Sequence, residues 1–225
     1  MEFELSEQST LIVIGISFLV SGSISLLIRW QRKKRREAVR QLAEELGFDF
    51  VGWLDLVGHV PADYKLFDEG GDLARHYFER DDAHTRTTFF EYVPNGKDSF
   101  FWSVTYSAVR FRFKGLNLPR FALRNRSFVR LMDDFISKEP IDIEHDADLA
   151  SSYLLEGKDE AAIKKLFDTS LTKGLLEFKS FSVEGKGPEL LVYKRGKLDV
   201  DEIRSFLSDG VKILQLFLTS VAHSH

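Results

Sequence analysis

Four carboxylates and one imidazole within seven residues form the densest group of side chains that could do chemistry. The group consists of Asp142, Glu144, His145, Asp146 and Asp148. Carboxylate oxygens bind Mg²⁺ or Ca²⁺, and an imidazole extends the choice to transition metals. The spacing lacks the ordered glycine and the terminal glutamate of an EF-hand loop, so a solvated acidic loop is the simpler interpretation. A metal site here predicts the alternative function, a metal-dependent enzyme acting close to a membrane.

Other signatures of catalysis are missing from the sequence. The chain has no cysteine, which excludes disulfides, thiolate nucleophiles and Cys-type zinc sites. It has no phosphate-binding P-loop, no Gly-x-Ser-x-Gly elbow and no His-Glu-x-x-His pair. A net charge of −4 argues against a nucleic-acid partner. We therefore expect no cofactor, and we expect binding rather than catalysis.

Arginines recur between positions 110 and 130 and form a regional basic surface. They are Arg110, Arg112, Arg120, Arg124, Arg126 and Arg130. Such a surface could receive a phosphate group or an acidic partner. The simpler interpretation is a solvated strand face that balances the acidic remainder of the chain.

Charge is distributed unevenly at the start of the chain. An acidic tip at residues 1–9 precedes residues 10–28, a run of 19 residues without charge. As a helix this run would be roughly 28 Å long, close to the ~30 Å hydrocarbon core of a bilayer. The sequence therefore predicts a transmembrane helix at residues 10–28. A cleaved signal peptide fits less well, because its first residues would be basic rather than acidic. A buried helix of a soluble core also fits less well, because its flank would not need seven basic residues within twelve.

The residues that follow the uncharged run fit a membrane interface. We call them the collar: Arg29, Trp30, Arg32, Lys33, Lys34, Arg35 and Arg36. Basic residues beside a span remain in the cytoplasm, and tryptophan favours the interface. This predicts a single-pass protein of the cell (plasma) membrane, with its N-terminus outside and its C-terminal domain in the cytoplasm. Lysine and arginine also attract anionic lipid, so the lipid bilayer is a predicted partner.

Five small residues share one broad side of the predicted span, namely Gly15, Ser17, Ser21, Gly22 and Ser25. Small residues allow two helix backbones to approach closely in a membrane. This side predicts a homodimer or a partner transmembrane helix docked on it. Harmless exposure to lipid is the alternative interpretation.

The remaining sequence predicts an α+β fold. A basic juxtamembrane helix at residues 29–47 leads into a cytoplasmic domain at residues 48–225. Thr85–Val93 is rich in β-branched and aromatic residues, as strands are. Ala108–Phe113 alternates in polarity, as a strand with one buried face does. Asp199 and Glu202 form a capping box that starts the closing helix. We expect antiparallel hairpins with packed helices.

Two predicted hairpins share a loose pattern. Val93, Gly96 and Lys97 in the first correspond to Val183, Gly185 and Lys186 in the second. The domain could therefore consist of two similar halves, residues 48–124 and 125–225. Turn chemistry alone would produce the same short match.

Six segments together carry a resemblance to a family: Arg32–Arg36, Leu42–Phe48, Phe89–Tyr92, Leu118–Arg124, Ile141–Glu144 and Leu190–Tyr193. In these segments the chain resembles uncharacterised bacterial single-pass membrane-anchored proteins. The resemblance implies a bacterial inner-membrane location and supplies no catalytic residues. The expected function is a membrane-tethered cytoplasmic binding or assembly module, a small subunit of a larger membrane complex, with a protein partner for its cytoplasmic domain.

Overall fold

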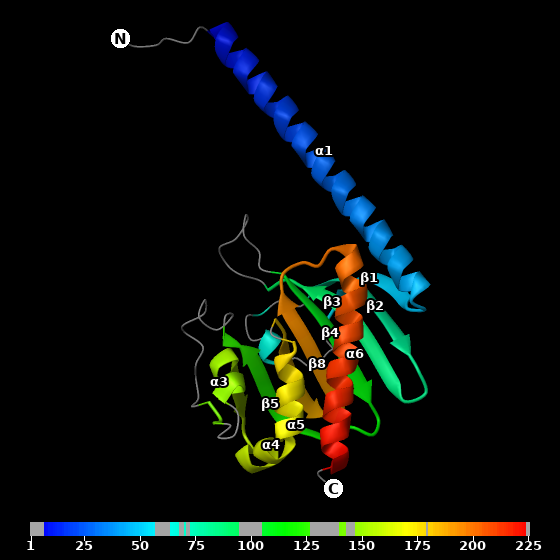
Figure 1. Cartoon of the computed structure of the whole chain (residues 1–225). Helices are drawn as coiled ribbons and strands as arrows, with labels where there is room; N and C mark the ends of the chain where they lie inside the picture. Colours follow the sequence, from blue (N-terminus) through cyan, green and yellow to red (C-terminus); the bar gives the residue numbers. More distant parts are fainter. Residues whose placement is uncertain are drawn as a thin grey trace, which may run out of the picture.

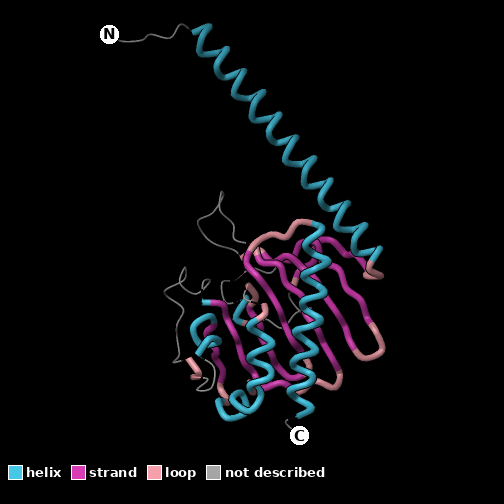
Figure 2. The backbone as a smooth tube through the Cα atoms, viewed as in Figure 1, coloured by secondary structure: helices cyan, strands magenta, loops and turns pink. Residues whose placement is uncertain are grey.

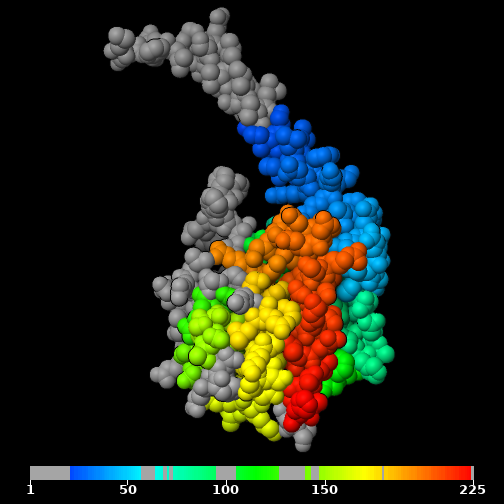
Figure 3. All heavy atoms as spheres, viewed as in Figure 1, coloured from blue at the N-terminus to red at the C-terminus, as the bar shows by residue number. Residues whose placement is uncertain are grey.

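The computed structural model describes residues 7–56, 64–67, 70, 73–94, 105–126, 140–142, 147–178 and 180–223, with side chains from residue 21 onward. The chain is an α+β fold in which one antiparallel sheet of eight strands carries helices on a face (Figure 1). This confirms the expected α+β class and its antiparallel hairpins. The long N-terminal helix projects beyond the packed body (Figure 1), and its part from residue 21 to where it joins the body is seen as spheres in Figure 3.

The strands are β1 (Asp49–Asp55), β2 (Leu73–Asp81), β3 (Thr85–Tyr92), β4 (Tyr106–Phe113), β5 (Leu118–Asn125), β6 (Tyr153–Gly157), β7 (Ser182–Gly187) and β8 (Glu189–Arg195). Their order in the sheet is β1-β2-β3-β4-β8-β7-β5-β6. Strand β8 lies between β4 and β7, so strands from residues 48–124 and from residues 125–225 share one sheet. The division into two similar halves stays a prediction.

The helices are α1 (Glu7–Glu45), the 3₁₀ turn η1 (Lys65–Phe67), α3 (Ala147–Ser152), α4 (Glu160–Leu166), α5 (Thr169–Leu176) and α6 (Val200–His223). The predicted capping box starts α6, because the Asp199 backbone N–H donates to Glu202 Oε2 at 2.8 Å. Asp168 caps α5 by accepting from the Leu171 backbone N–H at 2.8 Å. These caps fix where the C-terminal helices begin on the sheet.

The two faces of the sheet pack differently. Helices cover one face of the sheet (Figure 2). They bury a large aromatic core there, in which the centre of the Phe121 ring lies 5.0 Å from that of Phe167 and 5.4 Å from that of Phe217. A smaller cluster includes Tyr64 and Leu66 from the η1 region together with Tyr193 of β8. Neighbouring residues of a strand point to opposite faces, so Ala122 and Glu184 project away from the core that holds Phe121 and Val183.

The structure corrects the predicted transmembrane helix at residues 10–28. Among the side chains that the structure describes, no helix is long and apolar enough to cross a membrane. Helix α1 includes residues 10–28 and continues without a break to Glu45. Three further predictions depended on this span and are not supported: a single-pass membrane protein, a membrane tether, and an inner-membrane location with a cytoplasmic domain.

Candidate functional site

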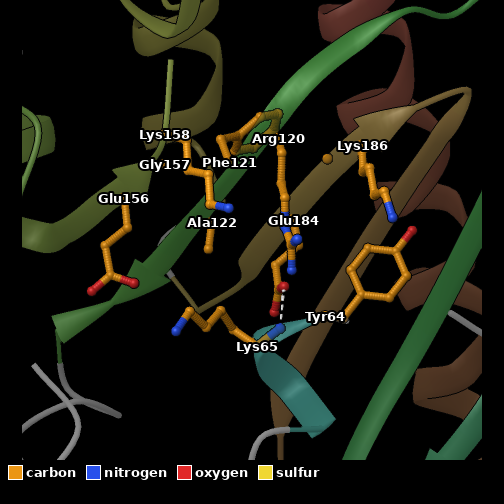
Figure 4. A pocket seen from close by; sticks show the side chains of 11 residues that line it. Tyr64, Lys65, Arg120, Phe121, Ala122, Glu156, Gly157, Lys158, Glu184 and Lys186 are labelled. Atoms are coloured by element: carbon orange, nitrogen blue, oxygen red, sulfur yellow. Dashed lines mark hydrogen bonds between the residues drawn. The ribbon is translucent and has the colours of Figure 1, made fainter. Parts of the chain in front are cut away.

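A pocket of about 310 Å³ opens on the sheet beside η1 (Figure 4). We call it the sheet-face pocket. Four separate segments build it, one before and within η1, one on β5, one at the end of β6 and one on β7. Its lining residues are Tyr64, Lys65, Arg120, Phe121, Ala122, Glu156, Gly157, Lys158, Glu184, Gly185 and Lys186.

Glu184 anchors η1 to the sheet. Its side chain is buried, and Oε2 accepts the Lys65 backbone N–H at 2.6 Å while Oε1 accepts the Leu66 backbone N–H at 2.9 Å (Figure 4). Burial raises the pKa of Glu184 to about 7, against the opposing effect of these N–H groups and the Tyr193 hydroxyl. Both oxygens are therefore engaged inside the protein, and Glu184 positions η1.

The second carboxylate of the pocket is also engaged. Glu156 Oε1 accepts from Arg124 Nη2 at 2.7 Å, and both side chains are mostly buried between β5 and β6. A buried ion pair of this kind is costly to break, because the remaining charge would be left without a partner. Arg124 Nε is buried and has no hydrogen-bond partner in the part of the chain that the structure describes.

Four cationic side chains line the same pocket, namely Lys65, Arg120, Lys158 and Lys186. Lys158 and Lys186 are exposed, and Figure 4 shows Glu156 and Lys186 on opposite sides of Glu184. The cations outnumber the two engaged carboxylates, and low-dielectric walls strengthen the field inside a cleft. The pocket is therefore suited to attract a carboxylate or another anion.

The predicted metal cluster lies mostly outside the described residues. Glu144, His145 and Asp146 are outside them, whereas Asp142 and Asp148 are described. Asp142 lines a different pocket of about 280 Å³ together with Arg126 and others. No group of three metal-binding side chains occurs among the residues that are described. The metal site, and the metal-dependent enzyme built on it, stay predictions.

The predicted docking face is only partly described. Ser21, Gly22 and Ser25 are exposed on α1, and the Ser25 hydroxyl donates to the Ser21 carbonyl at 2.8 Å. Gly15 and Ser17 lie in α1 ahead of the first described side chain. Without a span, a lipid bilayer and a transmembrane partner are not supported. The docking face itself stays a prediction.

The collar divides into two sets. Arg29, Trp30 and Lys34 are exposed, with Lys34 Nζ 5.4 Å from the centre of the Trp30 ring. The other collar residues line a second pocket where α1 meets the sheet: Arg32, Lys33, Arg35 and Arg36. The membrane-interface role predicted for the collar depended on the span that the structure corrects.

Sequence reasoning missed most of the sheet-face pocket. The basic surface predicted between positions 110 and 130 contributes Arg120, and Arg124 lies beside the pocket as the partner of Glu156. Lys158 and Lys186 gave no signal, because nothing in the sequence says that β6 and β7 both pair with β5. The available signal was Glu184, a charged residue between Val183 and Gly185 of the second predicted hairpin.

No family model matches the chain, and no curated protein matches it. A solved structure does. The crystal structure of the mycobacterial trehalose monomycolate transport factor A, TtfA, is similar at a TM-score of 0.50 and 14% sequence identity, covering 84% of this chain and 93% of that chain. The likeness is one of fold. At this identity it transfers neither a ligand nor a partner.

Proposed function

We propose that this chain is a binding module that receives an acidic segment of a partner protein in the sheet-face pocket. The arrangement of charge carries the proposal. Lys65, Arg120, Lys158 and Lys186 line the pocket, and its two carboxylates are held by groups of the same chain. A partner that brings carboxylates supplies the complementary charge.

The engagement of Glu184 argues for binding over catalysis. A general base needs hydrogen-bond reach to the proton that it removes. Both Glu184 oxygens accept backbone N–H groups, and the side chain is buried beneath η1. The pocket can therefore attract a ligand through the charge of its cationic side chains and donate hydrogen bonds to it.

The size of the pocket fits a small part of a partner. About 310 Å³ lies at the lower end of ligand pockets and is enough for one or two side chains. Tyr64 lines it and gives it an aromatic surface that can contact the aliphatic part of a glutamate. A fold shared with a protein named as a transport factor is compatible with a chain that acts by binding.

A labelled polyglutamate peptide tests the proposal directly. Fluorescence anisotropy should show binding of this peptide, weakened by added salt, and no binding of a polylysine peptide. The double variant Lys158→Glu with Lys186→Glu should weaken binding at least about tenfold. Both side chains are exposed, so the variant should fold, and circular dichroism checks that it does.

The matched control is Lys173→Glu. Lys173 is exposed on α5, away from the pocket, and its reversal should change binding less than about twofold. Equal effects of the control and the double variant would contradict the proposal. So would a polyglutamate affinity that only substitutions in the collar reduce.

A further inference from the structure

A second pocket, of about 400 Å³, lies where α1 meets β1 and β2, and Glu91 of β3 also lines it. We call it the collar pocket. One carboxylate, Glu91, lines it against six cationic side chains, which are Arg32, Lys33, Arg35, Arg36, Arg75 and Lys197. The excess of positive charge is far larger than in the sheet-face pocket.

Helix α1 supplies most of these charges from one side. Arg32, Arg35 and Arg36 are three and four positions apart, which places them on the same face of a helix. The close approach of Arg36 depends on Gly52 in β1, where φ is +93° and an added Cβ would lie 3.1 Å from Arg36 Nη2. A side chain at position 52 would be strained and would push Arg36 away.

A bulge in β2 contributes two adjacent residues to the pocket. In a regular strand Arg75 and His76 would point to opposite faces of the sheet. His76 has φ of +52°, and the pairing of β2 with β3 shifts register between Arg75 and Phe78. Bulges re-aim side chains in this way, and both residues line the collar pocket. Strained backbone at a non-glycine residue is more frequent at binding sites than elsewhere.

Glu91 holds two of the basic residues in place. Its carboxylate forms an ion pair with Arg35, and Oε2 lies 2.8 Å from His76 Nδ1. Arg35 Nη2 also donates to the Leu198 carbonyl at 2.6 Å. Burial alone would raise the pKa of Glu91, but the hydrogen bonds and charges of His76 and Arg35 outweigh it and lower that pKa. Glu91 is therefore an ionised anchor for Arg35 and His76.

Donors of the pocket remain without acceptors. The Nε atoms of Arg35 and Arg75 are buried and have no hydrogen-bond partner in the part of the chain that the structure describes. Unsatisfied buried donors are rare in folded proteins and call for an explanation. Burial lowers the pKa of Lys197, and the positive charge of Arg35 lowers it further. Both observations indicate a site that lacks negative charge.

We propose that the collar pocket binds the pyrophosphate group of a small molecule. Guanidinium groups match phosphate oxygens in geometry and charge, and several arginines converge here. A pyrophosphate brings several negative charges into one compact group, as the excess of cations requires. Trp53 lines the same pocket with half of its surface exposed, and its ring is stacked under Arg75 at 4.9 Å. It gives the remainder of the ligand an aromatic wall.

Calorimetry with inorganic pyrophosphate at constant ionic strength tests the proposal. We expect one site per chain and a higher melting temperature with the ligand present. The double variant Lys33→Gln with Arg36→Gln should weaken binding at least about tenfold. Both residues are exposed on α1 and take no part in the Glu91 network, so the variant should fold.

A matched pair of lysines provides the control. Lys158→Gln with Lys186→Gln also removes two positive charges, at the sheet-face pocket, and should change pyrophosphate binding less than about twofold. Equal weakening by both double variants would mean charge attraction without a site and would overturn the proposal. The absence of binding up to about 10 mM pyrophosphate would also overturn it. Neither result depends on whether the polyglutamate peptide binds.

Discussion

Two buried glutamates, one in each pocket, have pKa values that are shifted in opposite directions. Glu184 and Glu91 are 3% and 2% exposed, so burial is nearly equal. Yet the pKa of Glu184 is raised to about 7, whereas the pKa of Glu91 is lowered. Glu184 meets neutral backbone N–H groups, and Glu91 meets Arg35 and His76. The charge of the partners, rather than depth alone, decides the ionisation of each group.

The difference also separates what the two glutamates do. Glu184 fixes a piece of backbone, and the cations of its pocket come from other segments. Glu91 fixes the cations themselves, because Arg35 and His76 both contact its carboxylate. The collar pocket therefore depends on its carboxylate more strongly than the sheet-face pocket does.

Replacement of Glu91 by glutamine should have the largest effect on stability. Glu91→Gln leaves the mostly buried Arg35 without its counter-charge, and breaking such a pair costs about 3 to 5 kcal/mol. Urea denaturation at about pH 8 measures the free energy of unfolding. The matched variant is Glu184→Gln, which removes no ion pair and relieves an unfavourable charge at that pH. A smaller loss of unfolding free energy for Glu91→Gln than for Glu184→Gln would contradict the proposed difference between the two glutamates.

The pH dependence of stability should differ in sign between the two residues. Glu184 has a raised folded pKa, so the folded chain binds the extra proton and stability falls as pH rises from about 4.5 to about 7, by about 3 kcal/mol. Glu91 has a lowered pKa, so its contribution is present above pH 4.5 and is lost as pH falls below it. Subtracting the Glu184→Gln curve from the wild-type curve isolates the first effect. A flat difference curve would contradict it.

Substitution of Gly52 should cost about 1 to 2 kcal/mol of stability and also weaken pyrophosphate binding. Gly52→Ala strains a backbone with positive φ and displaces Arg36. Gly187→Ala is the matched control, because Gly187 has φ of +54° with open space around it. The control should lose stability to a similar degree, and calorimetry should show unchanged pyrophosphate binding. Weaker binding in both variants would mean that strain, and not Arg36, is responsible.

The smallest effect is expected at Tyr64. Its hydroxyl donates to Glu189 Oε2 at 3.0 Å, so Tyr64→Phe should cost about 1 kcal/mol of stability. Thermal denaturation at several pH values measures this loss. Since Glu189 is near the sheet-face pocket, pyrophosphate binding should not change. A loss as large as that of Glu91→Gln would show that the two pockets depend on their polar contacts equally.

Local patterns in the sequence predicted part of this molecule. The strand prediction at Thr85–Val93 is confirmed by β3, and the capping box at Asp199 is confirmed at the start of α6. Each of these signals comes from residues that are only a few positions apart along the chain. The predicted transmembrane helix was wrong, because no helix among the described residues is long and apolar enough to cross a membrane.

The pockets could not be predicted in the same way. Glu91 stands within the aromatic run Phe89–Tyr92, and nothing local places it beside Arg35, which is 56 positions earlier. The bulge at His76 decides which side chains reach the collar pocket, and it depends on the pairing of three strands. Such sites require the sheet order, which local periodicity does not contain.

The most direct test is the titration of Glu91 and Glu184 by ¹³C NMR of their side-chain carboxyl carbons, assigned with Glu91→Gln and Glu184→Gln. The account predicts that Glu184 titrates near pH 7 and that Glu91 stays ionised down to below pH 4.5. Titration of both carboxyls on the same side of pH 4.5 would contradict the claim that partner charge sets their states.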